Sequence, residues 1–281
     1  MKKVIAVLTK GYENIHQYNE LIKRNNSIER NLKEHCPVVI FHEGNIIKEH
    51  QNFISSKTNI SLTFIEIPPF SPKENIEFLE GTESFGWGYR HMCNFWFIDF
   101  WKYTNNYDLL LRIDEDCEIS FNIDKIFKLL EQKVCIYGKW VKDSEFVTKG
   151  IARYFNEYFA KCNHSEIKEA SGPYTNVVGF NLVRLRENKK LFKFIKKLKE
   201  DKFIFTHRWG DLPLWGGILS VLFSKNEYVE ENMISYFHKS HEAIVNPRIS
   251  VLFVKKYLKH FIKKVIPLKI LIYAKKYTNY G

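Results

Sequence analysis

The stretch LLLRIDEDCEI, residues 109–119, places three consecutive acidic residues directly behind a run of leucines. The apolar run predicts a buried strand. Three adjacent carboxylates repel one another unless water, a cation or basic side chains separate them. In an extended segment Asp114 and Asp116 point one way and Glu115 the other, and two carboxylates on one side suit Mg²⁺ or Mn²⁺. Acidic triplets are also common on protein surfaces, so the motif alone leaves both readings open.

The sequence on both sides of this strand alternates between strand and helix patterns. Short β-branched runs predict strands, and apolar residues at three- and four-residue spacing predict helices. The predicted strands are residues 4–10, 37–44, 61–68, 108–114, 134–140 and 176–183, and the predicted helices lie near residues 21–32, 88–103, 123–132 and 191–198 and in the second half of 209–223. This alternation predicts an α/β fold with a mostly parallel sheet covered by helices. Ligands bind such sheets beyond the carboxyl ends of the strands, where the acids of LLLRIDED stand.

Composition excludes several classes of protein. The chain has 281 residues, of which 45% are hydrophobic, and this can supply a sizeable core. Its five cysteines are scattered and form no C-x-x-C pair, which favours reduced thiols in a cytosolic protein over a disulfide framework or a zinc site. No phosphate-binding glycine loop and no uncharged segment of membrane-spanning length occur, so P-loop enzymes, dinucleotide-binding dehydrogenases and integral membrane proteins are disfavoured.

The net charge of +11 is concentrated at one end of the chain. Residues 248–281 hold nine lysines and arginines and no acid, so the rest carries only +2, and a specific nucleic-acid partner is not indicated. In VLFVKKYLKHFIKKVIP the apolar residues recur at helical spacing with lysines mainly elsewhere, which predicts an amphipathic tail on an anionic membrane surface. The alternative is a helix packed on the domain. We therefore divide the chain into a domain, 1–247, and a basic tail, 248–281.

Two further motifs accompany the acidic strand. GYRHMCNFWF, residues 88–97, precedes it, and HRWGDLPLWG, residues 207–216, follows it. Taken in order with RIDED and ISYFHKSH, they resemble the fungal α-1,2-mannosyltransferase family, whose members carry Y-R-H-M-C-R-F, R-V-E-P-D, R-W-G-D-x-P and a late tyrosine and histidine. The resemblance covers roughly residues 1–245.

The resemblance implies a nucleotide-diphospho-sugar transferase (GT-A-like) fold, GDP-mannose as donor, Mn²⁺ as cofactor and retention of the anomeric configuration. Carried over residue by residue, the metal ligands fall on Asp114, Asp116 and His238, with His241 as the alternative histidine. Tyr89 would face the acceptor sugar or the donor phosphate, and Asp211 would act near the acceptor hydroxyl. The predicted donor-binding residues are Thr9, Glu43, Tyr89 and Arg90. Two readings without function stay open, since Arg90 could pair with Glu83 and Trp209 could serve packing alone.

The chain also departs from the family. A glutamate considered as the family's nucleophile has its counterpart at Asn181 in NVVGFNLV, and an amide cannot form a glycosyl ester. The fungal enzymes carry an N-terminal membrane anchor, whereas this chain begins at its first predicted strand, which suggests a cytoplasmic relative. The sequence thus predicts a metal-dependent retaining glycosyltransferase acting on a glycan or lipid-linked glycan at the cytoplasmic face of a membrane. The rival is a non-catalytic basic protein that binds anionic lipid or nucleic acid through its tail.

Overall fold

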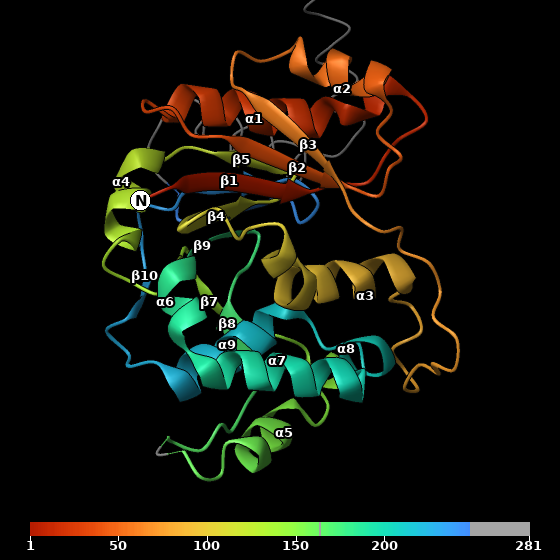
Figure 1. The fold of residues 1–281 in the computed structure, drawn as a ribbon, viewed down its shortest axis with the longest axis vertical. Helices are drawn as coiled ribbons and strands as arrows, with labels where there is room; N and C mark the ends of the chain where they lie inside the picture. The colour runs from red at the N-terminus through yellow and green to blue at the C-terminus, as the bar shows by residue number, and fades with distance from the viewer. Residues whose placement is uncertain (163, 248–281) are drawn as a thin grey trace, which may run out of the picture. The chain divides into compact units, whose positions relative to one another are not determined.

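The computed structural model describes residues 1–162 and 164–247, and Met1–Asn246 forms one compact unit. Its centre is a seven-stranded sheet in the order β10-β6-β9-β4-β1-β2-β3 (Figure 1). The strands are β1 Lys3–Leu8, β2 Val38–His42, β3 Leu62–Glu66, β4 Leu109–Ile113, β6 Cys135–Tyr137, β9 Val177–Asn181 and β10 Tyr228–Glu230. The predicted α/β class is confirmed.

The sheet is parallel except around one strand. β3, β2, β1 and β4 run in the same direction, and β9 pairs antiparallel with both β4 and β6. The chain passes from β1 outward to β2 and β3, then returns to place β4 on the other side of β1. The strand order therefore reverses between β1 and β4, which is where ligands bind in open α/β sheets.

Helices cover both faces of the sheet. They are α1 Asn19–Asn31, α2 Lys48–Ser55, α3 Trp87–Asn94, α4 Ile123–Leu130, α5 Ile151–Tyr158, α6 Leu182–Glu187, α7 Lys189–Asp201, α8 Phe203–Thr206 and α9 Asp211–Leu222. On one face α1 and α4 pack on Ile5, Leu109 and Leu111. On the other face Val4, Ala6 and Leu110 meet an aromatic-rich core from α3, α5, α7 and α9 (Figure 1). Alternate strand residues thus serve opposite cores, as the pleat requires.

Two small sheets complete the unit. One has the order β12-β11-β5, from β5 Cys117–Ile119, β11 Tyr236–His238 and β12 Ala243–Val245. The other joins β7 Trp140–Lys142 to β8 Ser171–Pro173. The register of the first pairs His238 with Cys117. This pairing brings a late histidine beside the acidic triplet that precedes β5.

Helix α9 touches β8 at backbone distance because both carry glycine there. A Cβ on Gly216 would lie 1.7 Å from the backbone oxygen of Ser171, and one on Gly172 would lie 2.1 Å from that of Leu212. Real Cβ atoms do not come this close, so only glycine permits the contact. The contact holds the first turn of α9, which includes Asp211, against the segment that leads into β9.

Several predicted elements have different bounds. The strand predicted over 134–140 divides into β6 and β7, and the helix predicted over 88–103 ends at Asn94 and continues as π and 3₁₀ turns. Helix α9 begins at Asp211, earlier than the glycine-containing half expected to be helical. The acidic triplet forms a turn between β4 and β5 in place of an extended segment. The predicted tail, 248–281, lies outside the described residues, among which no helix is long and apolar enough to cross a membrane.

Candidate active site

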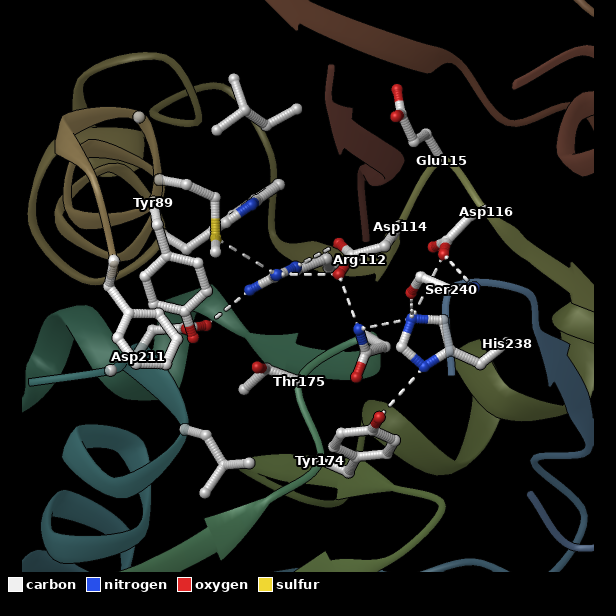
Figure 2. Close-up of a pocket in the computed structure, with 18 of the residues that line it drawn as sticks. Tyr89, Arg112, Asp114, Glu115, Asp116, Tyr174, Thr175, Asp211, His238 and Ser240 are labelled. Atoms are coloured by element: carbon white, nitrogen blue, oxygen red, sulfur yellow. Dashed lines mark hydrogen bonds and ion pairs between the residues drawn. The ribbon is translucent and has the colours of Figure 1, made fainter. Parts of the chain in front are cut away.

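A cavity of about 870 Å³ opens beyond the carboxyl ends of β1, β2 and β4. Figure 2 shows its polar side chains in two groups, with Asp116, Ser240 and His238 on one side and Tyr89 and Asp211 on the other. Arg112 and Asp114 lie between the groups, and Thr175 and Asn176 enter from the start of β9. The cavity thus combines residues from distant parts of the chain at the point where the strand order reverses.

Asp116 and His238 form the first group. The Nε2 atom of His238 lies 3.4 Å from Oδ2 of Asp116, which also accepts a hydrogen bond from the backbone N–H of Ser240 at 2.9 Å. Nδ1 of His238 lies 3.0 Å from Oη of Tyr174. In the tautomer whose Nδ1–H donates to Tyr174, the lone pair of Nε2 faces Asp116 and the cavity. A hydrogen bond of this kind orients histidines that bind metals.

The donor set of this group fits a divalent metal such as Mn²⁺. Among the described residues, Asp116, Cys117 and His238 are the group of three whose ligand atoms lie within 4.8 Å of one another. Burial raises the pKa of the Cys117 thiol well above its usual value, and its side chain does not line the cavity, which leaves the carboxylate and the imidazole. Burial raises the pKa of Asp116, but the hydrogen bond from the backbone N–H of Ser240 and the neighbouring imidazole of His238 outweigh this effect and hold the pKa below its usual range.

Asp114 is held by a buried arginine. Arg112 donates from Nε and Nη2 to the two carboxylate oxygens of Asp114, at 2.7 and 3.0 Å, and its guanidinium lies 4.5 Å from the ring centre of Trp96. Oδ2 of Asp114 also accepts from Nδ2 of Asn176 at 3.1 Å. Asp114 therefore lies one hydrogen-bonded residue away from His238, whose Nε2 is 3.4 Å from the same Asn176 amide nitrogen.

Arg112 also reaches the second group. Its Nη1 donates to Oδ2 of Asp211 at 2.6 Å, so one buried guanidinium bridges two carboxylates. Burial lowers the pKa of Arg112, but Asp114 and Asp211 outweigh this effect and raise it above its ordinary value. Arg112 consequently stays charged and fixes the position of Asp211 relative to the metal group.

A second buried arginine lies beneath the acidic turn. Arg24 of α1 donates from Nε to the carbonyl of Ile113 at 2.9 Å, and its side chain is fully buried. Burial lowers the pKa of Arg24 to about 9, while Asp114 and Glu115 act to raise it. Two arginines and the histidine therefore stand around the three acids, which explains how these carboxylates remain adjacent in the folded protein.

Tyr89 and Arg208 form the wall beside Asp211. Nη2 of Arg208 donates to Oη of Tyr89 at 2.6 Å, and Nη1 donates to Asp143 at 3.1 Å. Arg208 has a φ of +62°, a left-handed conformation that costs a non-glycine residue energy and is found at functional sites. The side chain of Arg208 lines the cavity, while the next residue, Trp209, is buried and donates to the carbonyl of Lys149. Trp209 thus serves packing.

The structure brings most of the predicted site residues to one cavity. Asp114, Asp116, His238, Tyr89, Asp211, Thr9 and Glu43 all line it. Both candidate histidines do so, but His238 is the buried one in contact with Asp116, whereas His241 is exposed and its ring centre lies 4.6 Å from that of His238. The geometry favours His238 as the metal ligand.

Two predicted residues lie elsewhere. Arg90 is fully buried and donates to the carbonyls of Phe85, Thr82 and Phe205, so it braces α3 and does not line the cavity. Asn181 pairs with Leu109 at the opposite end of β4 from the acids. Its side chain donates to the carbonyl of Leu130 and accepts from the backbone of Arg184 at the start of α6. Asn181 therefore caps a helix and takes no part in the cavity.

Sequence reasoning gave no role to several residues of the cavity. Arg112 stands in the quoted RIDED motif and Arg208 in the RWGD motif, so their motifs were a usable signal. The sequence carried no such signal for four other cavity residues, because nothing in YTNVV or FHKSH distinguishes them from ordinary polar residues: Tyr174, Thr175, Asn176 and Ser240. The antiparallel pairing of β9 with β4 places Asn176 beside Asp114.

The fold is similar to that of solved fungal mannosyltransferases. Core-mannan synthase A (CmsA/Ktr4) from Aspergillus fumigatus, in its Mn/GDP form, matches with a TM-score of 0.72 at 15% identity, over 85% of this chain and 75% of that one. The mannosyltransferase Ktr4p from S. cerevisiae in complex with GDP matches with a TM-score of 0.68 at 16% identity, over 85% of this chain and 71% of that one.

Comparison of the sequence alone finds neither a matching family model nor a matching curated protein. The three-dimensional likeness nevertheless extends over most of the described unit. It confirms the fold expected from the motif resemblance, because the described unit has the GT-A-like α/β fold of the solved fungal mannosyltransferases.

Proposed function

We propose that this protein is a metal-dependent glycosyltransferase that moves a sugar from a nucleotide-sugar donor to a glycan or lipid-linked glycan. The observation that carries the proposal is the pairing of Asp116 with His238 beside the Arg112–Asp211 ion pair, in one cavity at the reversal point of the sheet. The first pair suits a metal-bound diphosphate, and the second suits an acceptor hydroxyl.

Asp116 and His238 would hold the metal, and Asp114 would lie behind them, linked to His238 through the amide of Asn176. An imidazole beside a carboxylate suits Mn²⁺ better than Mg²⁺. When bound, such a cation stabilises the negative charge that a departing nucleoside diphosphate gains. Tyr174 would keep Nε2 of His238 directed at the site, and Lys10, which lines the same cavity, would add positive charge near the phosphates.

On the opposite wall Asp211 would accept the hydrogen bond of the acceptor hydroxyl. Arg112 pairs with Asp211 at 2.6 Å and fixes its orientation, and both side chains are buried. Tyr89, Arg208 and Asp143 would position the acceptor sugar through hydroxyl and guanidinium groups. Because Asn181 lies outside the cavity, it cannot contact the reacting sugar. Its identity therefore does not decide whether transfer passes through a covalent glycosyl-enzyme intermediate.

GDP-mannose as donor and retention of configuration are the finer parts of the proposal. They are supported by the motif resemblance and by the similarity to mannosyltransferases solved with GDP or with Mn and GDP. Mannose transfer with retained configuration would be read from the anomeric proton signals of the product by NMR. An inverted product would remove the retaining assignment and leave the transferase proposal intact.

A thermal-shift screen of GDP, UDP and their sugars, with Mn²⁺ or with EDTA, tests the proposed donor class. A ligand at a hundred times its Kd adds about 2.7 kcal/mol of stability, which corresponds to roughly 5–10 °C in Tm for a domain of this size. We expect such a shift for one nucleotide family in Mn²⁺ and none in EDTA. Mn²⁺-dependent hydrolysis of the same donor would then separate an enzyme from a basic binding protein, which should show neither effect.

We also propose that residues 248–281 attach the protein to the cytoplasmic face of an anionic membrane. The support is the sequence, in which nine basic residues and no acid accompany apolar residues at helical spacing. A protein ending at Pro247 is expected to keep transferase activity on a soluble acceptor and to stop co-sedimenting with anionic vesicles. Equal sedimentation of both forms at low salt would contradict the membrane role, and an unfolded truncated form would favour a helix packed on the domain.

A further inference from the structure

Glu115 separates Asp114 from Asp116 in sequence, yet it faces another part of the cavity. Its side chain runs away from both aspartates toward the N-terminal part of the chain (Figure 2). Its carboxylate accepts hydrogen bonds from Oγ1 of Thr9 and, at 2.8 Å, from Oη of Tyr12. Thr9 follows β1 and Glu115 follows β4, so this carboxylate lies at the reversal point of the sheet without a role in metal binding or at the acceptor.

Rigid elements hold this carboxylate in place. The backbone N–H of Tyr12 donates to Oη of Tyr18 at 3.0 Å, and the two rings meet edge to face at 5.0 Å. Tyr18 is fully buried, and its Oη lies 3.2 Å from Nδ1 of His50 on α2. Thr9 is buried at the end of β1. Glu115 is therefore oriented before any ligand arrives, as a recognition residue must be.

The carboxylate keeps unused acceptor capacity toward the cavity. An ionised carboxylate offers about four lone-pair sites, and Thr9 and Tyr12 occupy two of them. Both neighbours donate an O–H to this carboxylate, so its oxygens act as acceptors. Glu115 lines the cavity and is only partly buried. It can therefore accept from a further donor, and it repels phosphate.

Building on the proposed function, we propose that Glu115 binds the ribose hydroxyls of the donor nucleotide and makes the site selective for ribonucleotides. If the diphosphate is held at Asp116, the neighbouring residue is one Cα step of about 3.8 Å away, and the ribose is the part of the nucleotide joined directly to the diphosphate. The ribose hydroxyls carry no negative charge and can donate hydrogen bonds, so they suit a carboxylate that repels phosphate. Acidic side chains bind ribose hydroxyls in the same way in other nucleotide-binding α/β folds.

The test compares the affinities of GDP, 2′-deoxy-GDP and 3′-deoxy-GDP in Mn²⁺ for the wild type and for Glu115→Ala, with the UDP series in parallel. Hydrogen bonds to a charged group correspond to about a tenfold to a hundredfold change in affinity. We expect the wild type to bind the ribonucleotide tighter than at least one deoxy analogue by this factor, and Glu115→Ala to bind all three alike. The matched control, Glu157→Ala, removes an exposed carboxylate of α5 that does not line the cavity, and it should keep the wild-type ratio.

Two results would overturn the inference while leaving the proposed function standing. One is equal affinity of the wild type for ribo and deoxy forms. The other is an equal loss of affinity for all three nucleotides in Glu115→Ala. This would indicate that Glu115 only supports the loop around Tyr12. If the Tm of Glu115→Ala falls far below that of the wild type, Glu115→Gln replaces it. Its affinities for GDP and the deoxy analogues are then compared in the same way. Absence of any nucleotide binding in Mn²⁺ would instead remove the proposed function and this inference with it.

Discussion

Replacing Asp116 with alanine is expected to abolish Mn²⁺-dependent binding of the nucleotide-sugar donor and, with it, sugar transfer. Asp116 supplies the carboxylate that faces Nε2 of His238, and its oxygens hold the backbone N–H of Ser240 in the same corner. Without it, a metal would keep a single strong protein ligand. We expect donor affinity in Mn²⁺ to fall by about a hundredfold or more, in line with the loss of a directly bound metal ligand.

Calorimetric titration of GDP in Mn²⁺ measures this effect, and circular dichroism checks the fold. The companion variant Asp114→Ala should lose less, because Arg112 and Asn176 hold that carboxylate one step from His238. A matched control is Glu157→Ala, which removes an exposed acid paired with Arg153 on α5 and should bind donor like the wild type. Near-wild-type transfer by Asp116→Ala would remove the metal-site assignment.

Replacing Asp211 with asparagine is expected to reduce transfer by about a hundredfold or more while donor affinity changes by only a few fold. The change removes the charge that faces the acceptor and weakens the pair with Arg112, but Arg112 keeps both contacts to Asp114. The fold should therefore persist. The amide is nearly the same size as the carboxylate, so the packing of α9 on β8 is retained.

Transfer to a soluble acceptor and GDP affinity, measured on the same preparation, test this second expectation. Loss of GDP binding in proportion to loss of transfer would move Asp211 to the donor side of the cavity. A large fall in Tm would show that Asp211 chiefly neutralises Arg112. Arg112→Lys separates these cases further, because a lysine keeps the charge but cannot contact Asp114 and Asp211 with the planar fork of an arginine.

The strongest local patterns of the sequence predicted the central part of the fold. The leucine run before the acids became β4, and the spacing around Leu21 and Ile28 became α1 with its apolar side on the sheet. Burial of a whole strand or of one helix face leaves a period in the sequence that can be read without the partner. Short strands such as β11 and β12 have three residues each and leave no such period.

The motifs also placed Asp116, Asp211, Tyr89 and His238 at one site, which the structure brings together around a single cavity. The motifs did not show which of two arginines lines the cavity. Arg90 and Arg208 both stand in motifs beside aromatic residues, but Arg90 ends among backbone carbonyls and Arg208 turns toward the cavity. The difference lies in the partners that surround each side chain, which come from distant parts of the chain and which a local pattern does not encode.

The sequence by itself determined the α/β class, the position of the three acids at the end of a buried strand and the set of motifs that resemble the fungal mannosyltransferases. These are properties of neighbouring residues, because periodicity and motif spacing arise within one segment of chain. Only the tertiary structure decided that His238 contacts Asp116, that Arg112 joins Asp114 to Asp211 and that Asn181 caps a helix away from the cavity. The first and the third depend on strand pairing between distant segments, through the register of β5 with β11 and of β4 with β9. The second depends on the close packing of α9 against β8, which places Asp211 near the end of β4.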